Sequence, residues 1–77
     1  MMKHIKINYP WVEVEDRSEG SLVISLEDVS AVSDNNNGWY KYGIRFKDGS
    51  WSENVSIESL KELKEYLMGR IKEKEED

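Results

Sequence analysis

Apolar and polar side chains alternate over most of the first 55 residues, and this period of two predicts half-buried strands. The apolar positions are Ile5, Ile7 and Tyr9, then Val12 and Val14, then Leu22, Ile24 and Leu26, and finally Tyr40, Tyr42, Ile44 and Phe46. After residue 56 the spacing changes, because Ile57, Leu60, Leu63, Leu67 and Ile71 recur every three or four residues, as in an amphipathic helix. We therefore expect an α+β fold, with an antiparallel sheet of four or five strands packed against one C-terminal α-helix.

Turn and cap residues set the expected boundaries. Pro10 cannot donate a ladder hydrogen bond, so it predicts an edge strand or a bulge, with the strand resuming beyond it. Glu27-Asp28 interrupts the next strand and leaves two alternatives open, a bulge followed by more strand or a short helical turn. Asp48-Gly49 predicts a hairpin with a type I′ turn, and Ser56 suits a helix N-cap. We expect a single domain with its sheet over residues 3–55, its helix over 57–73 and a charged tail over 74–77.

Composition narrows the classes of function. A chain of 77 residues without cysteine has neither a disulfide framework nor a thiolate metal site, so a good core or self-association must stabilise it. The net charge of −5, from 16 acidic and 11 basic residues, disfavours non-specific binding to nucleic acid or to an anionic membrane. No apolar run approaches the roughly 20 residues that span a membrane, and the start of the chain lacks the apolar region of a signal peptide. We expect a cytoplasmic protein.

Candidate catalytic and metal-binding residues are few. His4 is the only histidine, and no serine lies in a nucleophile elbow or beside a base that could activate it. The carboxylates fall mostly in turns and on solvent faces, where groups with an unshifted pKa make poor general acids. Residues 34–38 (DNNNG) look like the start of a calcium loop, but the twelfth position is Arg45 instead of glutamate. We expect no enzyme activity, no catalytic residue, no metal and no cofactor.

Tryptophans and basic residues mark the sheet face opposite the expected core. By strand parity this face holds Trp11, Trp39, Lys41, Arg45, Lys47 and Trp51. Trp and Arg often anchor protein interfaces, and an aromatic patch on a small domain is typical of a binding site. We expect these six residues to bind another protein or a second copy of the chain as a homodimer. The alternative is that one or two of the tryptophans wrap over an edge into the core.

Two further functions stay open. The basic residues of the third strand interleave with Trp39, as on platforms for single-stranded nucleic acid, although the overall acidity disfavours this reading. Cross-strand pairing of those basic residues with Glu13, Glu15 or Glu53 would explain them structurally. Residues 12–34 hold seven acidic side chains and one basic one, which suits a phage-type inhibitor that mimics nucleic acid and occupies a basic cleft.

Three motifs resemble a known family. They are ISLEDV at 24–29, IRFKDG at 44–49 and VSIESL at 55–60, the last opening the helix. Together they resemble the small FlbD-type proteins of bacterial flagellar and swarming loci over about residues 20–67. The resemblance implies a β-then-helix fold in a bacterial protein, whereas the acidic-mimic hypothesis would suit a phage protein. The chain departs from that family in its longer N-terminal strand and in lacking an Asn-Pro-Asp turn, so no functional residue is carried over.

Overall fold

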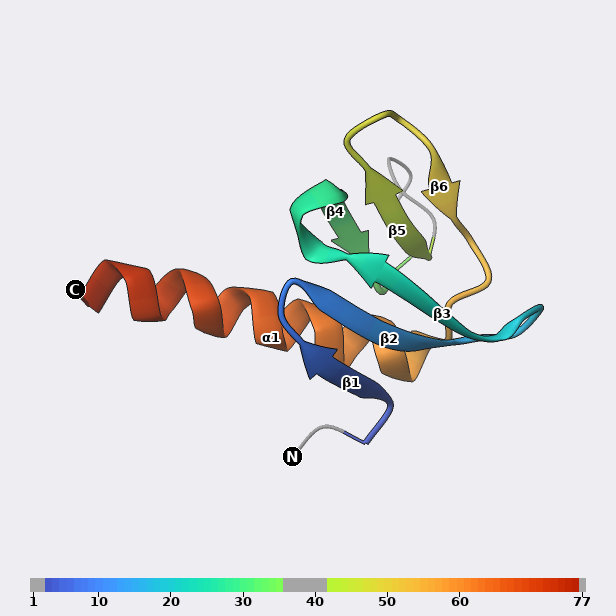
Figure 1. The fold of residues 1–77 in the computed structure, drawn as a ribbon, viewed down its shortest axis with the longest axis horizontal. Coiled ribbons are helices and arrows are strands. Elements are labelled where there is room, and N and C mark those ends of the chain that lie inside the picture. The colour runs from blue at the N-terminus through green and yellow to red at the C-terminus, as the bar shows by residue number, and fades with distance from the viewer. Residues whose placement is uncertain (1–2, 36–41, 77) are drawn as a thin grey trace.

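The fold is α+β, with six strands followed by one long helix (Figure 1). The computed structural model describes residues 3–35 and 42–76, with side chains described as far as Gly69. The elements are β1 (Ile5–Asn8), β2 (Trp11–Asp16), β3 (Gly20–Ser25), the 3-10 turn η1 (Leu26–Asp28), β4 (Val29–Ser33), β5 (Gly43–Phe46), β6 (Trp51–Ser52) and α1 (Ile57–Glu76). The predicted order of strands and then a helix is confirmed.

The strands form two antiparallel sheets of three strands, β1-β2-β3 and β4-β5-β6, instead of the expected single sheet. The division occurs at η1, where Glu27 and Asp28 form a helical turn between β3 and β4. The Leu26 N–H donates to the Pro10 carbonyl at 2.7 Å, which fixes the point where the chain leaves the first sheet. At the other end a bridge between Asp16 and Val55 joins the chain after β6 to β2. At Glu27-Asp28 the structure has the helical turn of the second alternative, and the strand predicted by the first alternative follows it as β4.

Two turns differ from the prediction. Pro10 lies in a two-residue turn between β1 and β2, where Asn8 pairs with Trp11. Of the two predicted alternatives the structure has the edge strand, β1, but the expectation that the same strand resumes beyond Pro10 is wrong, because the chain folds back there. Period-two alternation is the same for one bent strand and for two strands folded back on each other. The hairpin at Asp48-Gly49 exists, but its turn is not type I′, because Asp48 does not have the positive φ that this turn requires. Instead Gly49 is left-handed (φ +91°) and donates to the Phe46 carbonyl, as in a three-residue loop.

The core lies between the two sheets and the first half of α1. Its buried apolar residues are Ile5, Val12, Val14, Ile24, Leu26, Ile44, Val55, Leu60 and Leu63. Val12, Val14 and Ile24 line the inner face of β2 and β3, as their alternation predicted, and Leu60 and Leu63 come from the predicted helical stripe. Burial of such side chains contributes about 1.5–3 kcal/mol each.

Three residues assigned to the core by periodicity are exposed instead. Tyr9 lies in the β1–β2 turn, Tyr42 precedes β5, and Ile57 is the first residue of α1. Each lies at or just outside the end of a strand or helix, where periodicity no longer decides which side chains are buried. Tyr40, which was assigned to the same core face as Tyr42, lies outside the described residues.

Helix α1 begins where the sequence predicted and continues to Glu76, past the expected end at residue 73. The Ser56 hydroxyl accepts a hydrogen bond from the Ser59 N–H at 3.1 Å, which confirms Ser56 as the N-cap. The C-terminal half of the helix projects beyond both sheets (Figure 1). Within the described part of the chain, no helix is long and apolar enough to cross a membrane.

Candidate functional site

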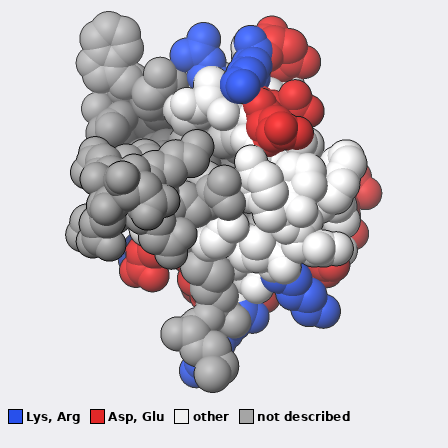
Figure 2. Space-filling model, turned by 60° about the vertical axis from the view of Figure 1, so that its left-hand side comes forward, with Lys and Arg blue, Asp and Glu red and all other residues white. Residues whose placement is uncertain are grey.

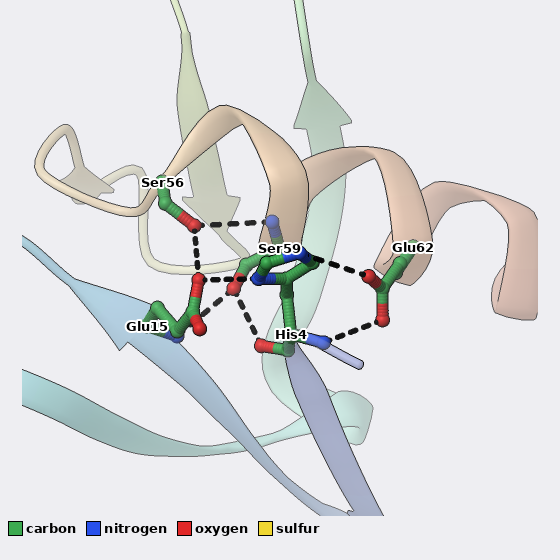
Figure 3. A network of polar contacts seen from close by, with 5 residues as sticks. All are labelled: His4, Glu15, Ser56, Ser59 and Glu62. Atoms are coloured by element: carbon green, nitrogen blue, oxygen red, sulfur yellow. Dashed lines mark hydrogen bonds and ion pairs between the residues drawn. The ribbon is translucent and has the colours of Figure 1, made fainter. Parts of the chain in front are cut away.

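A buried hydroxyl joins the first two strands to the helix. Ser59 is fully buried, and its Oγ accepts a hydrogen bond from the Glu15 N–H at 2.9 Å and donates one to the His4 carbonyl at 2.7 Å. The register pairs Ile5 with Val14, so His4 and Glu15 stand opposite each other at the next position of the ladder. The hydroxyl therefore occupies the place of a ladder hydrogen bond between β1 and β2, and it extends that ladder onto α1 (Figure 3).

The imidazole of His4 lies between two carboxylates from different elements (Figure 3). Nδ1 is 2.9 Å from Oε1 of Glu15, and Nε2 is 3.9 Å from Oε2 of Glu62 on α1. The other carboxylate oxygen of Glu62 accepts the His4 backbone N–H at 2.8 Å. The Ser56 hydroxyl donates to the same Glu15 oxygen that faces the ring, at 3.1 Å. We call His4, Glu15, Ser56, Ser59 and Glu62 the His4 cluster.

The electrostatics of the His4 cluster favour its charged form. The hydrogen bond to Glu15 raises the pKa of His4 above 6.5, and the negative charges of Glu15, Glu62 and Glu58 raise it further against the opposing effect of desolvation. The same hydrogen bond lowers the pKa of Glu15 below 4.5, with help from the Ser56 hydroxyl. Between pH 4.5 and 6.5, therefore, His4 is protonated and Glu15 is ionised at the same time.

The two serine hydroxyls of the cluster join β1, β2 and α1 through hydrogen bonds, and they do not serve as nucleophiles activated by the His4 ring. Ser59 Oγ is engaged with two backbone groups, and Ser56 Oγ with Glu15 and the Ser59 N–H, so neither hydroxyl donates to the His4 ring. Among the residues that the structure describes, no three His, Asp or Glu side chains are grouped as metal ligands.

Sequence reasoning missed this cluster, and one signal could have found part of it. Once β1 and β2 are recognised as a hairpin around Pro10, counting back from the turn places His4 opposite Glu15. Ser59 and Glu62 then lie three residues apart on α1, on the side that faces this end of the ladder. The hairpin itself was not predicted, so the counting could not be done.

Of the six predicted binding residues, the four that the structure describes do not share one sheet face. Trp11 belongs to β2 in the first sheet and is 52% exposed, whereas Trp51 belongs to β6 in the second sheet and is half-buried. Trp39 and Lys41 lie outside the described residues. The premise of one continuous aromatic face across a single sheet is therefore wrong for Trp11 and Trp51.

The second sheet does bring two of the predicted residues together. Arg45 on β5 pairs directly with Trp51 on β6, and both are half-buried. The Trp51 ring also lies over Gly43, where a Cβ would meet Cε3 at 3.4 Å.

Lys47 is exposed in the following hairpin loop, and its backbone N–H donates to the Asp28 carbonyl at 2.8 Å. Of the acidic partners proposed for these basic residues, Glu15 is engaged by His4 instead.

An apolar groove of about 350 Å³ lies between the η1–β4 segment and α1. Its apolar lining consists of Leu26, Val29, Ala31, Val32, Leu67 and Met68. Met68 at the rim is 53% exposed, and Lys64, which forms an ion pair with Asp34 at 3.2 Å, borders the groove. Figure 2 views the molecule from the side on which α1 projects, and a broad area of uncharged side chains lies there between charged groups above and below.

The backbone of the β1–β2 turn is adjacent to one end of this groove. The Leu26 N–H binds the Pro10 carbonyl, and Trp11 pairs with Ser25, so the turn is adjacent to the groove residue Leu26. Tyr9 and Trp11, on either side of Pro10, are each about half exposed. We call Trp11 and the six apolar lining residues the groove surface.

Comparisons of the chain with protein-family models, with curated proteins and with solved structures gave no match. The resemblance to FlbD-type proteins therefore stays a prediction.

Proposed function

We propose that this chain is a non-enzymatic protein-interaction module that binds an apolar segment of a partner protein at the groove surface. The observation that supports this most is an open apolar groove lined by Met68, together with Trp11, a second side chain that is more than half exposed, on the strand that pairs with Ser25 next to the groove residue Leu26. Exposed apolar patches with aromatic residues at their centre are typical of interfaces.

The energy available at this surface suits a binding role. A tryptophan can bury 150–250 Å² on full coverage, so covering the exposed half of Trp11 would remove about 100 Å² from water. At about 25 cal/mol per Å² this contributes about 2.5 kcal/mol, before any contribution from Met68 or from the groove floor. A single residue that contributes about 2 kcal/mol or more is a hot spot, so Trp11 would reach this value before the costs of association and side-chain ordering are subtracted.

The test compares variants that alter the groove surface with one that does not. Trp11→Ala and Met68→Glu change exposed side chains, so the fold should survive, as checked by circular dichroism. Ile57→Ser is the matched control, because Ile57 is also an exposed apolar residue but lies eleven helical positions from Met68, roughly 16 Å along the axis.

The readouts are light scattering after size exclusion, for a second copy, and affinity capture from the native host with mass spectrometry, for another protein. We expect both groove variants to lose the captured partner or the dimer, whereas Ile57→Ser retains it. Equal capture of a partner by all three variants would contradict the proposal. A wild-type chain that is monomeric and captures no partner would contradict it as well.

A second candidate, binding of single-stranded nucleic acid, is favoured by the contact pair Arg45 and Trp51, together with the nearby Lys47. Aromatic stacking combined with basic residues binds single strands with strong salt dependence. Titration with an oligonucleotide at about 50 mM salt should then quench tryptophan fluorescence, and Trp51→Phe should weaken the quenching. Unchanged fluorescence at this low salt would exclude this function. The acidic segment 12–34 as a mimic of nucleic acid also stays a prediction.

A further inference from the structure

The His4 cluster holds the first described strand at one end of the sheet. Among the described strands β1 pairs only with β2, and it is four residues long. An edge strand of this length has few ladder hydrogen bonds of its own, so contacts at its ends strongly affect how often it opens. Its first flanking residue is His4, which α1 contacts at three points: the backbone N–H, the carbonyl and the ring.

The position of the ring between two carboxylates favours a proton on both nitrogens. Nδ1 faces Glu15 and Nε2 faces Glu62, and both partners are carboxylates, which only accept hydrogen bonds when ionised. A neutral imidazole has one N–H, so its other nitrogen would direct a lone pair at a carboxylate. The imidazolium form donates to Glu15 through Nδ1 and places a positive charge within ion-pair distance of Glu62.

We propose that His4 is a proton-dependent latch that fastens strand β1 to helix α1, and that β1 opens more often once this histidine loses its proton. The charged groups that face the ring are Glu15 from β2 and Glu58 and Glu62 from α1, and all three favour the protonated form. Opening of β1 would expose Ile5, which is otherwise buried, and the edge of β2 that pairs with β1.

The direction of the pH effect follows from linkage. Because the pKa of His4 is raised in the folded protein, its contribution is fully present below pH 6.5 and is lost as the pH rises through the higher folded value. On the acid side, the pKa of Glu15 is lowered, so its contribution is present above pH 4.5 and fades as the pH falls through the lower folded value. The contacts of His4 therefore hold β1 against α1 most strongly between about pH 4.5 and 6.5.

The proposal is tested by amide hydrogen exchange of the full chain, measured by NMR from pH 5.5 to 8.5. After correction for intrinsic rates, protection of the β1–β2 ladder should fall as the pH rises, by up to about tenfold for each pH unit by which the folded pKa exceeds 6.5. Protection of the β2–β3 ladder should change less. The pKa of His4, read from its ring protons, should lie above 6.5 and should decrease in Glu62→Gln.

His4→Gln supplies the matched variant, because glutamine can still donate to Glu15 but cannot titrate. We expect the β1 protection of this variant to be independent of pH over the same range. The proposal is overturned if His4→Gln keeps the wild-type pH dependence, if both ladders lose protection equally, or if the pKa of His4 in the folded protein is not raised.

Discussion

Replacing Ser59 by alanine tests the energetic role of the hydroxyl that joins β1, β2 and α1. The substitution removes one oxygen from a fully buried site and leaves the Glu15 N–H and the His4 carbonyl without their partner. No buried side-chain polar atom of the described residues lacks a hydrogen bond in the wild type, so the variant would create a defect that the native fold avoids.

The expected loss can be worked out from the two orphaned groups. Each unpaired buried polar group costs about 1–3 kcal/mol, and a cost near the lower end, about 1.3 kcal/mol for each, applies because both groups are only partly buried. Alanine gains up to about 0.7 kcal/mol over serine in helix propensity. The net destabilisation is therefore about 2 kcal/mol. A domain of this size has roughly 3–5 kcal/mol of stability, so the variant should lose around half of it.

Urea unfolding followed by circular dichroism and tryptophan fluorescence measures this loss. In thermal unfolding the same 2 kcal/mol corresponds to a decrease in Tm of roughly 8–16 °C. Ser21→Ala is the control, because Ser21 is exposed on β3, and it should change stability by less than about 0.5 kcal/mol. Hydrogen exchange adds a local readout, since the Glu15 amide should lose protection in Ser59→Ala. A Ser59→Ala variant as stable as Ser21→Ala, with its Glu15 amide still protected, would refute the reasoning.

Three further substitutions have outcomes fixed by the structure. Asp16→Ala should cost about 1–3 kcal/mol in urea unfolding, because Oδ1 of this buried carboxylate accepts three hydrogen bonds across the β2–β3 turn. These bonds lower the pKa of Asp16, so its contribution should be complete above pH 3.8 and fade in acid. Gly43→Ala should cost at least about 2 kcal/mol, because φ is +153° and a Cβ would lie 2.6 Å from the Ser52 carbonyl oxygen; wild-type stability would contradict this. Gly69→Ala should raise Tm, since it gains up to about 1 kcal/mol of helix propensity in open space, and a lower Tm would count against it.

Features that depend on a few adjacent residues were predictable from the sequence. The Ser56 cap, the start of the helix at Ile57 and the hairpin at Asp48-Gly49 each depend on contacts within about five residues. The inward alternation of Val12 and Val14 was likewise visible, because successive side chains of a strand point to opposite faces. The exact turn type at Gly49 was not, since Asp-Gly is compatible with more than one hairpin geometry.

Features that depend on which strands are neighbours required the tertiary structure. The alternation at Ile5–Asn8 and Trp11–Asp16 indicates that both segments are half-buried. It does not indicate that they pair with each other around Pro10. The division into two sheets depends on the Leu26 to Pro10 hydrogen bond, which joins residues sixteen positions apart. This division also separates Trp11 from Trp51, so their shared parity did not place them on one surface.

The sequence by itself determined that this chain forms strands and then a capped amphipathic helix, because spacing and turn chemistry are local properties. Only the tertiary structure decided where its polar chemistry gathers. His4 and Glu62 are 58 positions apart, and Ser59 and Glu15 are 44 positions apart. No periodicity relates residues at such separations, and they meet only because burial of Leu60 and Leu63 places the first turns of α1 against the end of the β1–β2 ladder.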